Sequence, residues 1–179
     1  MEELIKVAYE LVVLLDKAAD KGLPKQIVDI VKLHSKLAVG SAFIPVPGAD
    51  MAAGAASIWT MYGRINTKVG IPIKENVLKS IGAGVATNLA SYIAVSGIAF
   101  AMKFIPGIGS LGGAFIMSAS FYAVTLVSGW VYLKALCMMV KRDGKFVSPD
   151  DLKIAVNQVL SNTTMINKLF NIAKKEYKS

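Results

Sequence analysis

Proline and glycine interrupt two apolar segments of this chain, and the candidate functional residues lie at these two interruptions. The first contains Pro45, Pro47 and Gly48, and Asp50 follows it directly. Asp50 is the only formal charge in the apolar block 37–62. Because proline breaks a helix, the block is predicted to be a short apolar segment, a turn and then a new helix.

Two roles are open for the Asp50 carboxylate. In the first turn of a helix over about 49–62, it would meet unpaired backbone N–H groups and act as a cap. At membrane depth a carboxylate is costly, so there it would indicate an ion path or a contact with a partner.

A weaker echo of the first interruption contains Pro106, Gly107 and Gly109. When Phe43 is aligned with Phe104, 6 of 15 positions are identical without a gap. Paired broken helices at corresponding places point to a site between repeats. Chance similarity between two apolar stretches is the alternative.

No pattern in the chain is typical of an enzyme. His34 is the only histidine and Cys137 the only cysteine, so neither a metal cluster nor an internal disulfide is expected. We expect His34 on a polar helix face or at a helix end, and Cys137 as an inert buried thiol. Phosphate loops, nucleophile elbows and dinucleotide turns are absent from the sequence. We therefore expect a non-enzymatic protein without cofactors.

The composition is apolar and basic. Of the 179 residues, 54% are hydrophobic, and the mean hydropathy is +0.53. Soluble domains are usually only ~45–50% apolar. There are 20 Lys and Arg against 12 Asp and Glu, a net charge of +8. The cations flank apolar segments, which suits membrane lipid as a partner better than nucleic acid.

The periodicity predicts an all-α fold in one domain with three parts. Apolar residues in steps of three and four predict amphipathic N-terminal helices within 1–36. Residues 37–140 contain the apolar core or membrane segments, and 148–178 form an amphipathic C-terminal helix. The block 37–62 is basic at both ends and is therefore expected to be a re-entrant loop or an interfacial helix pair rather than a simple crossing. A polar connector is expected over 64–79.

Two uncharged segments, 80–102 and 111–133, predict an apolar helical hairpin. A helix of 23 residues is about 34 Å long, enough for a hydrocarbon core of ~30 Å. Only Lys103 lies at the tip, whereas several cations lie at the outer ends, so both ends are expected in the cytoplasm. Trp130 and Tyr132 are expected at a membrane interface. The alternative is a soluble protein in which the hairpin is a buried core rich in alanine and glycine.

Small residues at every fourth position predict close helix packing in the first arm of the hairpin. The stripe consists of Gly82, Ala86, Ala90 and Ala94. Asn88 and Tyr92 could form hydrogen bonds across a helix interface.

The C-terminal helix has a clear start signal. Ser148 is expected as the cap, Pro149 at the first helical position and Asp151 at the third. The helix is expected to restart within 161–164, and its wide stripe favours packing on the N-terminal helices over lying on a membrane. The stripe consists of Leu152, Ala155, Val156, Val159, Leu160, Met165, Ile166, Leu169, Phe170 and Ala173.

Four runs of residues resemble a bacterial domain family of unknown function, DUF 697. They are LAVGSAFIPVPGADM at 37–51, WTMYGRIN at 59–66, KFIPGIG at 103–109 and SGWVY at 128–132. The similarity covers about 32–140. That family is often joined to Era-like or dynamin-like GTPase domains, so the resemblance implies a membrane-associated helical module that works with a GTPase. Since this chain has no GTPase motif, the GTPase would be a separate chain.

Three hypotheses for the function follow. The first is a non-enzymatic module of the bacterial inner membrane with cytoplasmic termini, which forms a homo-oligomer and couples to a partner GTPase. The second is a pore-forming or channel-like protein, with Asp50 near the path. The third is a cytoplasmic, soluble all-helical adaptor whose apolar hairpin is core.

Overall fold

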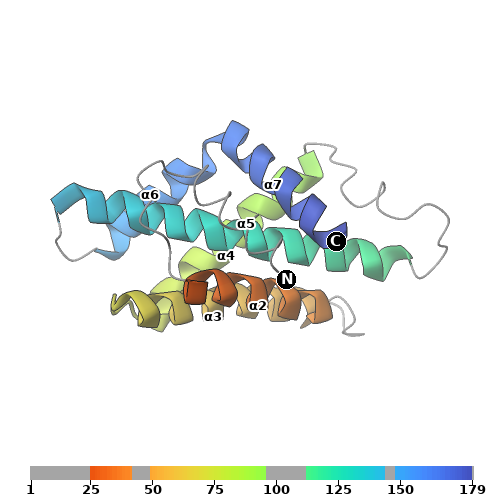
Figure 1. The fold of residues 1–179 in the computed structure, drawn as a ribbon, viewed down its shortest axis with the longest axis horizontal. Helices are drawn as coiled ribbons and strands as arrows, with labels where there is room; N and C mark the ends of the chain where they lie inside the picture. Colours follow the sequence, from red (N-terminus) through yellow and green to blue (C-terminus); the bar gives the residue numbers. More distant parts are fainter. Residues whose placement is uncertain (1–24, 42–48, 96–111, 144–147, 179) are drawn as a thin grey trace.

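The fold is all-α, as the sequence predicts. The computed structural model describes residues 25–41, 49–95, 112–143 and 148–178, and the account below concerns these residues. They form six helices and contain no strand (Figure 1). The helices are α2 (Lys25–Ser41), α3 (Ala49–Val69), α4 (Glu75–Val95), α5 (Gly112–Asp143), α6 (Pro149–Leu160) and α7 (Thr163–Lys178).

The longest helix, α5, lies at the centre and contacts all five others (Figure 1). Every side chain from Tyr122 to Leu133 is buried. By length and composition alone, the span Met117–Met139 is the one described helix that is long and apolar enough to cross a membrane. In its most apolar window, 78% of the residues are buried inside the fold. Its apolar character therefore also serves the packing of this chain.

Helices α3 and α4 run antiparallel and are joined by a short turn at Gly70. Gly70 has φ +72°, a left-handed conformation that commonly ends a helix and that glycine adopts without strain. The polar connector predicted over 64–79 is therefore wrong, because α3 continues to Val69 and α4 begins at Glu75. The extra turns of α3 form because Ile65 and Asn66 face the core, while Thr67, Lys68 and Val69 are exposed to solvent.

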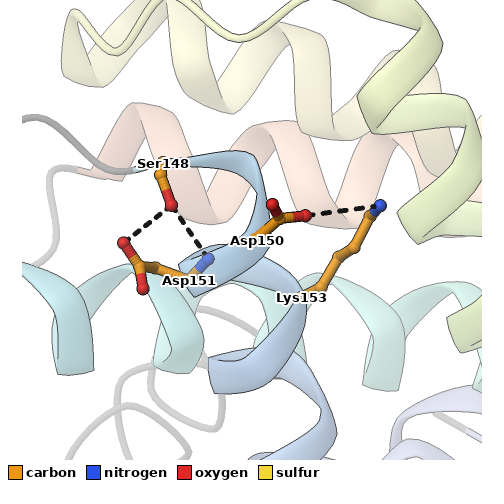
Figure 2. A network of polar contacts seen from close by, with 4 residues as sticks. All are labelled: Ser148, Asp150, Asp151 and Lys153. Carbon is orange, nitrogen blue, oxygen red and sulfur yellow. Dashed lines mark hydrogen bonds and ion pairs between the residues drawn. The ribbon is translucent and has the colours of Figure 1, made fainter.

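The predicted start of α6 is confirmed. The Asp151 backbone N–H donates to Ser148 Oγ at 3.1 Å, and the Ser148 hydroxyl donates to Asp151 Oδ2 at 2.7 Å (Figure 2). Pro149 occupies the first helical turn, where its missing N–H costs nothing. Lys153 forms an exposed ion pair with Asp150 at 3.9 Å.

Helices α6 and α7 pack on α5, so packing on other helices is confirmed, but the predicted partner, the N-terminal helices, is wrong for α2 among the described residues. The restart between them is also confirmed, with the Met165 backbone N–H donating to Asn162 Oδ1 at 3.0 Å. Tyr92 of α4 stacks on Phe170 with a ring centroid distance of 5.8 Å. Of the predicted stripe Met165 is partly buried and the other nine are buried: Leu152, Ala155, Val156, Val159, Leu160, Ile166, Leu169, Phe170 and Ala173.

Three aromatic side chains lie deeper than the sequence predicts. Trp130 is 1% exposed and Tyr132 is 0% exposed, so their predicted place at a membrane interface is wrong in this fold. His34 was expected on a polar face or at a helix end, and this is also wrong, because it is 2% exposed in the middle of α2. In each case another helix of the same chain covers the side chain, and periodicity within one helix does not reveal such long-range packing.

Candidate functional site

The two interruptions that the sequence singles out fall largely outside the described residues. This applies to Pro45, Pro47, Gly48, Pro106, Gly107 and Gly109. Asp50 lies in the first turn of α3, but its side chain is also outside the described part. The cap and the ion path therefore both stay predictions. The end of α2, the start of α3, the end of α4 and the start of α5 all lie toward the right of Figure 1.

The small residues of α4 bring it close to α3 at one place. A Cβ added at Gly82 would lie 3.4 Å from side-chain atoms of both Ile58 and Trp59. Further along α4, Ala86 is half-buried and Ala90 is exposed. Asn88 is exposed, and the side chain of Ala94 is not described. Whether this stripe packs against a further helix stays a prediction.

Beyond Gly82, toward the start of α3, an apolar groove opens between α3 and α4, and α5 forms its floor. We call it the α3–α4 groove. Its volume is about 490 Å³, and its described lining consists of five residues of α3, five of α4 and four of α5. It extends from Ile58 and Ala83 at one end to Met51 and Ile93 at the other. None of the described lining residues carries a charge.

The groove exists because the residues that face each other across it are small. Five of the fourteen lining residues are alanines, and Gly54 is a sixth small position. The Phe121 ring of α5 fills the space below Gly54, where an added Cβ would lie 3.3 Å from two ring carbons. Protein interiors rarely leave such space empty, so a groove of this size is a candidate binding site.

Charge is segregated along the helices that form the groove. Met51–Gly63 of α3, Ser80–Val95 of α4 and Gly112–Leu133 of α5 contain no charged residue. The cations of these helices and of the turn lie toward the opposite ends: Arg64, Lys68, Lys74, Lys79, Lys134, Lys141 and Arg142. Helix α2 differs, since Lys32 and Lys36 lie within it. The uncharged surface is therefore the one around the groove.

At the Gly82 end, a cation and an aromatic ring lie beside the groove. Lys79 Nζ lies 5.6 Å from the centroid of the Trp59 ring and 2.8 Å from Glu75 Oε1. The side chains of Lys79 and Glu75 are 50% and 73% exposed. Such an exposed ion pair contributes little to stability, so the Lys79 ammonium can exchange its partner at small cost.

On the other side of α3, a buried polar layer joins it to α5. The rings of Tyr62 and Tyr132 stack with centroids 3.9 Å apart. The Tyr132 hydroxyl donates to Asn66 Oδ1 at 2.9 Å, and the Tyr62 hydroxyl donates to the Ser128 carbonyl at 3.2 Å. All four residues are buried. These contacts fix the position of α3 relative to α5, and each tyrosine hydroxyl donates one hydrogen bond within the layer. The layer therefore has a structural role.

A second buried polar contact joins α2 to α3. The Ser57 hydroxyl donates to the His34 carbonyl at 2.9 Å and lies 3.4 Å from His34 Nδ1. Burial and the positive charge of Arg64 lower the pKa of His34, so its ring is neutral near pH 7. Three buried polar atoms among the described residues have no hydrogen-bond partner: His34 Nε2, Asn66 Nδ2 and Trp130 Nε1.

The described residues contain no group of three His, Cys, Asp or Glu residues that could hold a metal ion. His34 faces a serine and has no described carboxylate as a hydrogen-bond partner. Sequence reasoning identified Ala86 and Ala90 but missed Met51, Ile93 and Phe121, because a groove between three helices leaves no spacing pattern in the chain.

The chain is similar to magnetosome membrane protein 22 of Magnetospirillum gryphiswaldense. The two are 29% identical over 107 residues, which cover 59% of this chain and 55% of that protein. The chain thus spans about half the length of this relative. No family model matches the chain, and no solved structure matches it. The resemblance of 32–140 to DUF 697 stays a prediction.

Proposed function

We propose that this chain is a membrane-associated helical module that acts through binding and not through catalysis. The observation that supports it most is the charge segregation on α3, α4 and α5. Their uncharged parts form the surface around the α3–α4 groove, and their cations gather toward the other ends.

Physical chemistry gives this arrangement an orientation. A Lys or Arg near an anionic membrane surface gains about 1 kcal/mol, whereas a charge placed at the centre of a membrane helix costs ~2.5–3.5 kcal/mol. The end with Arg64, Lys68 and Lys74 therefore belongs at the headgroups. The groove side, whose described lining carries no charge, enters the bilayer, and Asp50 at the start of α3 is the one formal charge of α3, α4 and α5 at that end. The buried helix α5 then needs no lipid contact along most of its length.

The comparison and the resemblance support the same proposal. The similar protein bears the name of a membrane protein. The DUF 697 resemblance adds a partner GTPase supplied by a separate chain, and the proposal also includes self-association of the module. From the distribution of cations and the positive-inside rule, the proposal places the module in the bacterial inner membrane with its termini in the cytoplasm.

Flotation with lipid vesicles tests membrane association directly. The full chain is mixed with phosphatidylcholine vesicles that contain or lack phosphatidylglycerol, and the floating fraction is measured. We expect recovery with the anionic vesicles and a loss when Lys68 and Lys74 are both changed to Glu. Recovery of the chain only in the lipid-free fraction, at every composition, would contradict the proposal. Pull-down of a GTPase from the native host tests the partner separately.

A soluble helical adaptor is the second candidate, and one observation favours it. The apolar window of α5 is 78% buried within the chain itself, as the core helix of a soluble protein would be. This candidate predicts a chain that stays in solution without detergent or lipid and ignores vesicles. The flotation experiment therefore separates the two candidates.

A further inference from the structure

We propose that the α3–α4 groove holds one acyl chain of a membrane phospholipid, with the lipid phosphate beside Lys79. This inference rests on the proposed membrane association. Three properties of the groove support it: its length, its lining and the charge at one end.

The length of the groove matches one leaflet of a bilayer. Its α4 wall runs from Ala83 to Ile93, which is about 15 Å at ~1.5 Å per residue. The hydrocarbon core of a bilayer is ~30 Å thick, so one leaflet is about 15 Å. An acyl chain that starts at the Ala83 end would thus reach the Ile93 end at the bilayer midplane.

The lining suits a hydrocarbon chain. Its polar side chains are only the hydroxyl groups of Thr87, Ser120 and Thr125, and the remaining eleven lining residues are apolar. A volume of about 490 Å³ lies within the ~300–1,000 Å³ typical of ligand sites. A charged or strongly polar ligand would lose its hydration here without compensation.

The charge at the Gly82 end suits the headgroup. The groove ends where Gly82 meets Ile58 and Trp59, and Lys79 lies one helical turn before Ala83. The Lys79 ammonium is half-exposed and bound only by the exposed Glu75 carboxylate and the Trp59 ring. A phosphate can compete for this ammonium, and tryptophan favours the headgroup level of a membrane.

Photo-crosslinking tests both the occupant and its direction. The full chain is reconstituted with phospholipid that carries a diazirine either near the acyl carbonyl or at the terminal methyl. We expect the first probe to label peptides with Ala83 and Ala86, and the second to label peptides with Ile93 and Met51. Even labelling over all exposed helix faces would overturn the inference, and so would copy-to-copy crosslinks through the groove without lipid label.

A matched pair of variants on α4 makes the test specific. Ala90→Leu adds three carbons inside the groove, and Gly84→Leu adds a side chain where a Cβ meets nothing within 4 Å. Because the added side chain occupies space that the acyl chain would fill, Ala90→Leu should lower groove labelling about tenfold, with no change for Gly84→Leu. Equal labelling in both variants would overturn the inference.

Failure of the inference can be told apart from failure of the proposed function. If the chain floats with vesicles but shows no groove labelling, the proposed membrane association stands and the proposed acyl-chain site is wrong. If the chain does not float, the proposed function is wrong. For such a chain the same diazirine is supplied on a single-chain lysophospholipid in solution, and absence of groove labelling then overturns the inference by itself.

Discussion

The two sides of α3 face apolar surroundings that differ in the size of their side chains. Toward α2 and α5, the large rings of Tyr62, Tyr132 and Trp130 fill the space completely. Toward α4, alanine and glycine leave a groove of about 490 Å³. The same low polarity therefore gives a rigid interface on one side and room for a ligand on the other. Side-chain volume, more than hydropathy, separates core from candidate site in this chain.

Truncating the packed side should have the largest effect. Trp130→Ala removes the largest fully buried side chain, and such changes cost about 3–5 kcal/mol of stability. Trp130→Phe should cost clearly less, because it keeps a ring and removes an indole N–H without a partner. Urea unfolding followed by circular dichroism measures both. Equal losses for the two variants would show that the volume of the buried ring does not govern the stability of this side.

The glycines offer the next contrast. A Cβ at Gly129 would lie 2.7 Å from Val31 Cγ1 and 3.1 Å from Met61 Sδ. Since valine is stiff at χ1 and cannot move away cheaply, Gly129→Ala should cost about 1–3 kcal/mol. Gly84→Ala, at an open helical position, should instead stabilise the chain by about 0.5–1 kcal/mol. Unfolding midpoints that shift the same way in both variants would refute the packed-versus-open contrast.

The polar layer should respond more modestly. Tyr132→Phe keeps the stack on Tyr62 but leaves the buried Asn66 carbonyl oxygen without its hydroxyl donor. The expected loss is about 1–2 kcal/mol. Tyr92→Phe is the control, because the Tyr92 hydroxyl donates to the Thr163 carbonyl at 3.4 Å in an exposed position. If Tyr92→Phe lowers the free energy of unfolding as much as Tyr132→Phe does, burial of the hydroxyl does not explain the loss in Tyr132→Phe.

The smallest effect should appear as a pH dependence. Burial lowers the pKa of His34 below its ordinary value of 6.5, so below that pH the unfolded chain binds more protons than the folded one. The contribution of neutral His34 to the free energy of unfolding is therefore fully present above about pH 6.5. It is lost as the pH falls through the lowered pKa that His34 has in the folded chain. Thermal unfolding at pH 7.5 and pH 5.0 measures the loss. His34→Gln should reduce this pH dependence, and an unchanged dependence would assign it to other groups.

Local signals in the sequence predict the C-terminal part well. Ser148, Pro149 and Asp151 are neighbours, and their roles at a helix start depend on that spacing alone. The buried stripe on α6 and α7 follows from periodicity in the same way. For these helices the sequence analysis and the structure agree residue by residue.

Elsewhere, the sequence could not reveal which helix covers which face. The charges over 64–79 indicate a connector, but Ile65 and Asn66 are drawn into the core by α5, and Gly70 marks the true end of α3. Trp130 is of a residue type that favours membrane interfaces, but in this fold it lies in the core. The groove depends on three helices meeting, so its lining could not be predicted before the fold was known.

Site-specific fluorescence tests the central claim most directly, because it asks which surface meets lipid. In a Cys137→Ser background, a polarity-sensitive dye is placed at Ala90→Cys beside the groove or at Asn157→Cys on the exposed face of α6. Anionic vesicles should shift the emission of the Ala90 dye to the blue and leave the Asn157 dye in water. A shift of equal size at both sites, or at neither, would contradict the account that the uncharged groove side of α3, α4 and α5 enters the membrane.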